Sequence, residues 1–468
     1  MNPSAPEFSR RHFLGQCCAA VGTTGILSTL AQLRVIGAVA GNNLARARAA
    51  ALPPDYKALV CLFLNGGNDA TNLIIPSDAT SYAAYAKSRA ELAVSQSSLL
   101  PITPRRYADG RSWALHPSMP ALRDLFAQGK LAVLANVGTL VRPTTLADYN
   151  AGKNLPPQLF SHSDQQLQWQ SGVPDKPFET GWGGRLGDLV AALNSSNDIS
   201  LAISLAGSNS FQRGTTVAPY TVGTFGAPVM YLAGTATNYR PRDTALRNVL
   251  ANSPANLLEA AFGGITQDAW SDSETLRGVL QTAPALKTVF PGNDLAGQLA
   301  MVAKLISVAP TLGLKRQIFF VELGGWDLHA AQVTGHGPLL GQLSGAIKAF
   351  YDATVELGVA NQVTTFTASD FGRTYIPNAG GTDHGWGNHQ LIMGGAVQGG
   401  DIYGKMPSLT VGAEDDTGRG RWIPSTSVDE YSATLATWFG VSAANLPVVL
   451  PNIGRFTKPN LGFMGGGE

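Results

Sequence analysis

Cysteine is scarce in this chain, and so is charge. Only 3 of the 468 residues are cysteines, and two of them, Cys17 and Cys18, lie close to the N-terminus. If that segment is removed, Cys61 is left alone and no disulfide can form within the remaining chain. Charged residues make up 14% of the chain, and the formal net charge is +1. Because there is no basic stripe and no zinc-finger spacing, we expect no nucleic-acid partner.

Long apolar runs are missing as well once the N-terminal segment is passed. No later run is long enough to span a membrane, and there is no internal repeat and no coiled-coil pattern. Glycine and proline are abundant instead, with 53 and 28 copies, which indicates many turns and loops. The roughly 420 residues after that segment suffice for one large α/β domain with insertions, or for two domains.

The N-terminus carries a motif of the twin-arginine export type. The motif Ser9-Arg10-Arg11-His12-Phe13-Leu14 is followed by a moderately apolar stretch and then by alanine-rich cleavage patterns. We predict that residues 1–49 are a signal peptide, that the twin-arginine translocase is a transient partner, and that the protein reaches the periplasm or is secreted. An amphipathic N-terminal helix is the alternative. Contact with a membrane is expected only through an uncleaved signal.

Continuous apolar runs, typical of strands buried on both faces of a sheet, alternate with helical patterns. The predicted strands are 57–64, 131–137, 317–323, 362–368 and 391–394. The predicted helices are 116–128, 339–357, most of 241–313, and one that Ser427 and Glu430 open as a capping box. This alternation predicts an α/β fold, a mostly parallel doubly wound sheet with helices on both faces.

The domain organisation follows from the same pattern. We assign residues 50–468 to a single α/β domain with an insertion at about 195–313. The first part of that insertion is rich in serine, threonine and glycine, which is typical of β-hairpins or irregular structure.

Aspartate and histidine gather after two of the predicted strands. Asp327 and His329 follow the strand at 317–323, and His384 lies in a glycine-rich turn. In an extended segment, residues i and i+2 point to the same side, so Asp327 and His329 can reach one metal ion. His384 offers a third ligand of the kind that zinc prefers. We expect Asp383 to face away from the ion, as a residue that orients a ligand histidine. The alternative is a structural role, with Asp327 as a helix cap and both histidines as packing or loop residues. His336 and His389 are further candidate ligands.

Four further residues stand at or near strand and helix ends. Asp370 follows the strand at 362–368 and is either a metal ligand or the partner of Arg373 in a salt bridge. Asn65 ends the first strand, where a metal site would be expected to have a carboxylate. Ser161 precedes a predicted helix, whose free N–H groups stabilise an alkoxide or a bound anion. It is either a nucleophile or only the helix cap.

Together these motifs resemble a bacterial family of twin-arginine-exported proteins known as domain of unknown function 1501. The likeness covers nearly all of the chain after the signal. The matching pieces are Phe-Leu-Asn-Gly-Gly-Asn-Asp at 63–69, Leu-Phe-Ser-His-Ser-Asp at 159–164, Gly-Gly-Trp-Asp-Leu-His at 324–329, Ser-Asp-Phe-Gly-Arg-Thr at 369–374, Gly-Thr-Asp-His-Gly-Trp-Gly at 381–387, and a last segment at 427–440.

The order and spacing also resemble the alkaline phosphatase and sulfatase superfamily. This resemblance implies an alkaline phosphatase-like fold in which Ser161 is the nucleophile. It implies a first metal ion held by Asp327, His329 and His384, and a second ion held by Asp370 and the residue at position 65.

The sequence departs from the superfamily pattern at several points. Asn65 replaces an aspartate, Phe371 replaces a histidine, and Asp327 and His329 are only two apart. The Cys-x-Pro-x-Arg signature of sulfatases is absent. These departures weaken a two-metal mechanism.

Two functional hypotheses follow. The first is an exported metal-dependent hydrolase of small-molecule phosphate or sulfate esters, in which Ser161 attacks, a divalent ion such as zinc, manganese or calcium polarises the ester, and Arg373 steadies its oxygens. The second is a catalytically inactive exported protein on the same fold, which binds or assembles with another exported protein. Asn65 and Phe371 favour the second hypothesis, and the intact histidines favour the first.

Overall fold

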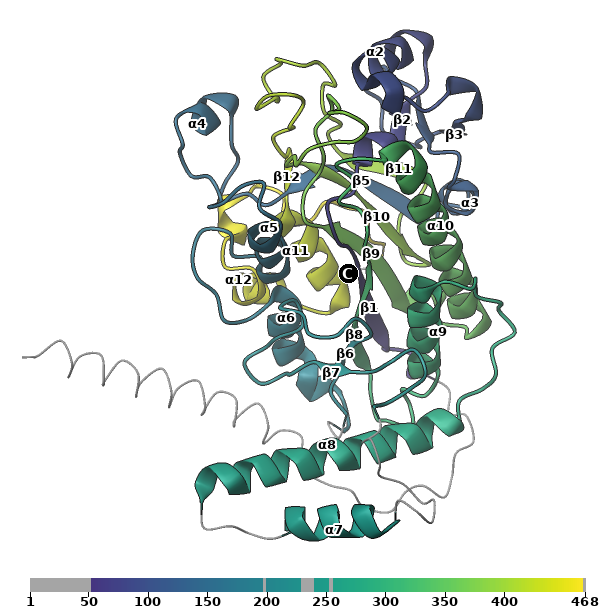
Figure 1. Ribbon diagram of the computed structural model, residues 1–468, viewed down its shortest axis with the longest axis vertical. Coiled ribbons are helices and arrows are strands. Elements are labelled where there is room, and N and C mark those ends of the chain that lie inside the picture. Colours follow the sequence, from purple (N-terminus) through teal and green to yellow (C-terminus); the bar gives the residue numbers. More distant parts are fainter. Residues whose placement is uncertain (1–51, 197–198, 229–239, 252–255, 466–468) are drawn as a thin grey trace, which may run out of the picture.

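The computed structural model describes residues 52–196, 199–228, 240–251 and 256–465, and its central feature is one large sheet (Figure 1). The strands of this sheet are β1 (Lys57–Leu64), β5 (Leu131–Gly138), β6 (Ala202–Ser204), β7 (Tyr220–Thr221), β8 (Arg316–Leu323), β9 (Val363–Ser369), β10 (Asn388–Gly394), β11 (Asp401–Gly404) and β12 (Thr426–Ser427). A small second sheet contains β2 (Ile74–Pro76), β3 (Leu100–Ile102) and β4 (Trp113–Leu115).

The large sheet is mostly parallel. Its order is β11-β5-β10-β9-β1-β8-β6-β7, with β12 also paired to β5, and β10 runs antiparallel to both of its neighbours. The predicted strands at 57–64, 131–137, 317–323, 362–368 and 391–394 are confirmed to within three residues at each end. Nearly every side chain in them is buried, which favours the apolar runs of β1 and β5 and the valine, phenylalanine and threonine residues of β9.

Helices cover both faces of this sheet, as Figure 1 shows, with α3, α9 and α10 on one side and α5, α6, α11 and α12 on the other. The fold class predicted from the sequence is therefore confirmed. The helices are α2 (Ala79–Arg89), α3 (Pro120–Ala127), α4 (Leu146–Asn150), α5 (His162–Ser171), α6 (Trp182–Val190), α7 (Arg240–Ala251), α8 (Leu257–Gln281), α9 (Asp294–Ser307), α10 (Gln332–Glu356), α11 (Val428–Phe439) and α12 (Leu446–Val449).

Two local signals explain how these helices form and dock. The capping box predicted at Ser427 and Glu430 opens α11. The predicted apolar face of α9 is fully buried, and α9 packs against both α10 and β8. An amphipathic helix buries its single apolar stripe by turning that stripe toward the core.

The segment predicted as an insertion, 195–313, contributes to the sheet as well as to its surroundings. β6 pairs in parallel with both β7 and β8, so the expectation of β-hairpins there was wrong. Residues 205–219 are long enough to return the chain to the same end of the sheet, which a parallel pair needs and a hairpin does not. Helices α7 and α8 extend away from the sheet at the bottom of Figure 1. The division into domains stays a prediction.

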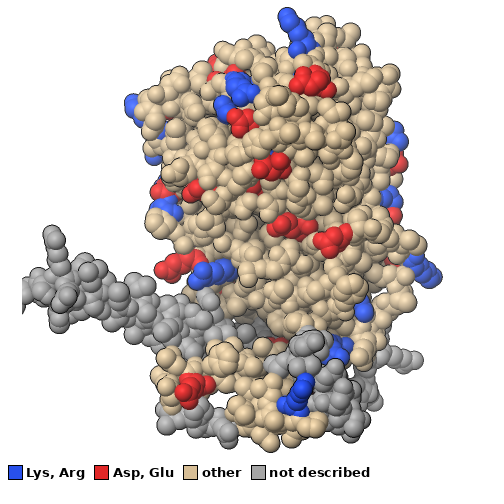
Figure 2. All heavy atoms as spheres, in the orientation of Figure 1, with Lys and Arg blue, Asp and Glu red and all other residues tan. Residues whose placement is uncertain are grey.

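The predicted signal, residues 1–49, lies outside the described residues. Within the described part of the chain, no helix combines the length and apolar character needed to cross a bilayer. On the face drawn in Figure 2, charged side chains of both signs are scattered singly.

Candidate metal centre

The loops that follow β9, β1 and β8 leave the sheet side by side. Leu64 at the end of β1 pairs with Leu323 of β8 on one side and with Ser369 of β9 on the other. These three strands are therefore neighbours in the sheet. Asn65, Asp370 and the turn that carries Asp327 all emerge at the carboxyl edge, where open α/β sheets place their sites.

Two glycines let the loops approach each other. Gly66 has a φ of +118°, and a Cβ at this position would lie 2.5 Å from the backbone nitrogen of Asp327. A Cβ on Gly381 would lie 2.3 Å from the carbonyl oxygen of Leu328. A residue with a side chain would therefore separate the loop of Asp327 and His329 from its two neighbours.

The three predicted ligands converge. The Nε2 atoms of His329 and His384 lie 2.9 Å apart, and Asp327 Oδ1 lies 3.0 Å from the first and 3.6 Å from the second. An isolated antiparallel bridge between Arg373 and His384 fixes the third ligand's loop against the sheet edge. The sequence thus predicted the convergence of these side chains, whereas their binding of a metal stays a prediction.

A fourth residue, His162, was missed by the sequence reasoning. It is the first residue of α5, and its Nε2 lies 3.1 Å from His384 Nε2 and 3.4 Å from Asp327 Oδ1. Helix-start preferences directed attention to Ser161 at the preceding position. The only available signal was that His162 lies inside the same Ser-His-Ser-Asp motif.

Hydrogen bonds at Nδ1 turn two imidazoles toward the centre. His384 donates from Nδ1 to the carbonyl oxygen of Phe160 at 2.6 Å, and His162 donates from Nδ1 to Asp370 Oδ2 at 2.6 Å. In the neutral rings the Nε2 lone pairs then face each other at 3.1 Å. Burial lowers the pKa of His384, whereas the hydrogen bond to Asp370 raises the pKa of His162.

Arg373 holds Asp327 in place. Its buried guanidinium donates to Asp327 Oδ1 and also to the carbonyl oxygens of Gly66, Gly67 and Thr382. Burial alone would raise the pKa of Asp327, but the hydrogen bond from Arg373 brings it below its usual value. All three nitrogens of Arg373 thus have protein partners, which makes it an organiser of the loops. Its predicted contact with an ester oxygen stays a prediction.

Asp370 and Asn65 are joined by a glutamine amide. Gln166 Nε2 donates to Asn65 Oδ1 and to Asp370 Oδ2, at 2.9 Å in both cases. Asp370 is fully buried and accepts further hydrogen bonds from Gly66 N and His162 Nδ1. The two residues predicted to hold a second ion are therefore close together, with both amide hydrogens of Gln166 directed at their oxygens.

Ser161 is the N-cap of α5, but its side chain makes no capping bond. Its hydroxyl donates to Asp164 Oδ2 at 2.5 Å, so a carboxylate is positioned to accept its proton. Asp383 was expected to face away from the ligands. Its carboxylate instead forms a group with His329 and His384 whose ligand atoms lie within 4.8 Å of one another, and it also accepts from Arg421.

The donor set fits a borderline metal ion. Ligands about 2.0–2.2 Å from a tetrahedral zinc ion lie about 3.3–3.6 Å from one another. The five pairs given above, among Asp327, His162, His329 and His384, span 2.9–3.6 Å. Two lone pairs that face each other at 3.1 Å require a proton or a cation between them, and imidazole nitrogen is a favoured ligand of zinc.

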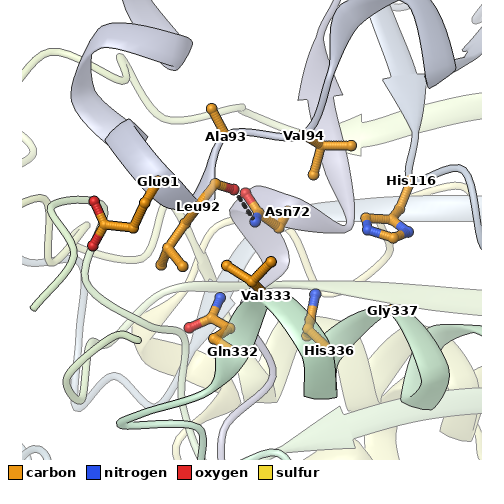
Figure 3. A pocket seen from close by; sticks show the side chains of 10 residues that line it. All are labelled: Asn72, Glu91, Leu92, Ala93, Val94, His116, Gln332, Val333, His336 and Gly337. Carbon is orange, nitrogen blue, oxygen red and sulfur yellow. Dashed lines mark hydrogen bonds between the residues drawn. The ribbon is translucent and has the colours of Figure 1, made fainter. Parts of the chain in front are cut away.

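A separate pocket of about 200 Å³ lies beyond the N-terminus of α10. In Figure 3, His336 rises from α10 toward the space between Asn72 and His116. None of the four residues above lines it, so the pocket and the cluster are distinct. Its lining residues are Asn72, Glu91, Leu92, Ala93, Val94, His116, Gln332, Val333, His336 and Gly337.

Comparisons with solved structures give similarities at low sequence identity. They include the PsFucS1 sulfatase from Pseudoalteromonas sp. (11% identity, TM-score 0.35, 88% of this chain and 70% of that chain). They also include the lipoteichoic acid synthase LtaP from Listeria monocytogenes (6%, 0.35, 91% and 80%) and a variant of alkaline phosphatase PafA (11%, 0.28, 69% and 64%). No curated protein has a matching sequence.

The family comparison agrees with the motifs. The matching family model is described as "Protein of unknown function (DUF1501)" and covers residues 296–431. This range includes Asp327, His329, Asp370, Arg373 and His384. The stretch of the chain that carries most of the candidate centre is therefore similar to the DUF1501 family.

Proposed function

We propose that this protein is an exported, metal-dependent hydrolase of phosphate or sulfate esters. One observation carries the proposal: His162 and His384, each anchored through Nδ1, present their Nε2 lone pairs to each other at 3.1 Å beside the carboxylate of Asp327. The fold can hold such an arrangement at low cost when a cation lies between the nitrogens.

The charges around the centre favour an anionic substrate. Asp327 is paired with Arg373, and Asp383 is paired with Arg421 and lies 3.6 Å from Arg419. Arg373, Arg419 and Arg421 thus place three guanidiniums beside the centre. A bound divalent ion would add two further positive charges there, and this local positive charge favours a phosphate or sulfate group.

The ion, when bound, supplies Lewis-acid polarisation of the ester. The chain's own residues supply the rest. Ser161 is the nucleophile of this proposal, Asp164 accepts its proton through the 2.5 Å hydrogen bond, and the N-terminus of α5 stabilises the developing negative charge. Arg373 keeps Asp327 ionised and directed at the centre.

The ligand types favour zinc over manganese and calcium. Calcium is bound by oxygen ligands, usually six or more. The cluster offers three imidazole nitrogens and one carboxylate oxygen among its closest groups. Imidazole suits zinc and other transition metals.

Export through the twin-arginine route is part of the proposal, and the motif at Arg10 and Arg11 supports it. The translocase and a small-molecule ester are then the expected partners. Replacing Arg10 and Arg11 with lysines should keep the protein in the cytoplasm, as measured by cell fractionation; unchanged periplasmic accumulation of the double variant would rule out this route.

The test of activity is hydrolysis of nitrophenyl phosphate and nitrophenyl sulfate by purified protein, stripped of metal and then supplied with zinc or manganese. We expect hydrolysis only after metal is restored, and its loss in Ser161→Ala even though that variant still binds metal. Ser442→Ala is the matched control, because Ser442 is an exposed helix N-cap outside the centre whose side chain also makes no capping bond. Hydrolysis that survives both chelation and Ser161→Ala would contradict the proposal.

One observation favours the alternative, an inactive exported binding or assembly protein. Gln166 and Asn65 are neutral groups in the region where a two-metal enzyme would have charged ligands and a second ion. This alternative predicts metal binding without turnover of either nitrophenyl ester.

A further inference from the structure

We infer that the centre holds a single ion, that His162 is one of its ligands, and that Gln166 takes the position of a second ion. This inference rests on the proposed function only in supposing that a metal is bound. It concerns how many ions bind and which residues of this chain hold them.

The first step concerns His162. Its Nε2 lies within 3.4 Å of both Asp327 Oδ1 and His384 Nε2, and these three residues form one group with metal-ligand spacing. Its Nδ1 hydrogen is given to Asp370, which is 0% exposed. A carboxylate that accepts from the far nitrogen of an imidazole is the usual way in which proteins orient a metal-binding histidine. Asp370 is therefore a positioning residue for His162.

The second step concerns the hydrogen-bonding capacity of Asp370. Its Oδ1 accepts from Gly66 N at 3.0 Å, and its Oδ2 accepts from both His162 and Gln166. A second ion bound there would have to displace at least one of these donors. A buried carboxylate that already has three donors gains little from such an exchange.

The third step concerns Gln166. An amide nitrogen has two hydrogens, and here one is directed at Asn65 Oδ1 and the other at Asp370 Oδ2, both at 2.9 Å. The amide thus joins the two oxygens as a bridging cation would, but without the charge. Asn65 in turn donates from Nδ2 to Glu322 at 3.1 Å, which fixes the direction of its oxygen toward Gln166.

The test is the metal content per chain of purified full-length protein, measured by elemental mass spectrometry after dialysis against zinc, together with a zinc titration. We expect one equivalent in the wild type. His162→Ala should weaken zinc binding more than about 100-fold, beyond the loss of 10–100-fold typical of residues that only orient a ligand. Asp370→Asn should fall within that smaller range and keep the stoichiometry of one.

Gln166→Glu supplies a gain-of-binding test. It places a carboxylate beside Asp370, where like charges attract a cation, and we expect a second equivalent of zinc. Gln128→Glu, an exposed change of the same chemistry at the end of α3, should remain at one. A Gln166→Glu protein that also remains at one equivalent would contradict the assignment of Gln166 to the position of a second ion.

Two equivalents in the wild type, or unchanged zinc affinity in His162→Ala, would overturn the inference. If His162→Ala does not fold, X-ray absorption of the zinc-loaded wild type decides, because three coordinated imidazoles support the inference and two overturn it. One bound ion without ester hydrolysis would end the proposed function but leave this inference intact. Two bound ions with ester hydrolysis would overturn this inference but leave the proposed function intact.

Discussion

The six histidines of the described residues form two sets that differ in what their nitrogens contact. In the open set, His162, His329 and His384, the side chains are 29%, 43% and 21% exposed, and their Nε2 atoms face one another or a carboxylate. In the closed set, each ring hydrogen-bonds to a backbone N–H or an amide oxygen. His116 Nδ1 accepts from Ser118 N, His336 Nε2 pairs with Asn68 Oδ1, and His389 Nδ1 accepts from Asn136 N.

Burial lowers the pKa of histidines in both sets. It lowers the pKa of each closed-set histidine to about 4, which keeps these rings neutral at neutral pH. In the open set, His162 has a raised pKa because Asp370 accepts its hydrogen bond. A histidine therefore becomes a candidate ligand here because its Nε2 faces a shared target, and not through its residue type; in His162 and His384 a hydrogen bond at Nδ1 fixes that direction.

The largest expected effect separates the sets by metal binding. His384→Ala removes the ring that lies against both His162 and His329, so zinc affinity and ester hydrolysis should each fall more than about 100-fold, beyond the effect of losing a residue that only orients a ligand. His389→Ala, from the closed set, should bind zinc as tightly as the wild type per folded molecule. Isothermal titration of both variants with zinc checks this. Equal zinc affinities would show that the two sets do not differ in metal binding.

The second effect is a difference in the free energy of unfolding between variants of the closed set and of the open set. His389→Ala leaves the backbone N–H of Asn136 without its acceptor, which costs about 1–3 kcal/mol in a buried site. His329→Ala, in an exposed loop, should change the free energy of unfolding by less than about 0.5 kcal/mol in metal-free protein. Urea denaturation in the presence of a chelator measures both. A larger loss in His329→Ala would show that the open set supports the fold.

The third effect is the change of stability with pH. His336 and His389 have folded-state pKa values of about 4, below the value of about 6.5 in an unfolded chain. The unfolded chain therefore binds more protons between these values, so stability is full above pH 6.5 and falls toward pH 4, by up to about 1.4 kcal/mol per pH unit for each ring. His389→Gln should reduce the slope of stability against pH by the contribution of one imidazole ring.

A buried carboxylate opposes this slope and supplies the control. Burial raises the pKa of Asp429 to about 8, so its contribution stabilises the fold as pH falls from 8 toward 4. The comparison of wild type with His389→Gln should therefore be repeated in an Asp429→Asn background. An unchanged slope on replacing His389 in both backgrounds would contradict the assignment of that ring to the closed set.

The sequence predicted the strands and three of the four side chains of the centre, for identifiable reasons. β1 and the middle of β8 are continuous apolar runs because both faces of the sheet are buried, and β9 combines apolar residues with buried threonines. Asp327 and His384 follow a strand end or lie in a glycine turn. His162 was missed because the direction of the first side chain of α5 depends on where that helix docks. Spacing along the chain does not contain that information.

The roles of Arg373 and Gln166 were hidden for a related reason. From the sequence alone, Arg373 would be interpreted as a free cation near a site. In the structure its N–H groups donate to carbonyl oxygens, among them those of Gly66 and Gly67 in a loop distant in sequence. Gln166 has no charge to mark it, and it matters only because Asn65 and Asp370 happen to lie on either side of it. Both roles arise from tertiary packing.

The most direct test of this account is an anomalous difference map at the zinc absorption edge, from a crystal of the protein grown with zinc. The account predicts one strong peak among Asp327, His162, His329 and His384, with none between Asn65 and Asp370 and none beside His116 and His336. No peak at the open set, or a peak beside the closed set, would contradict it.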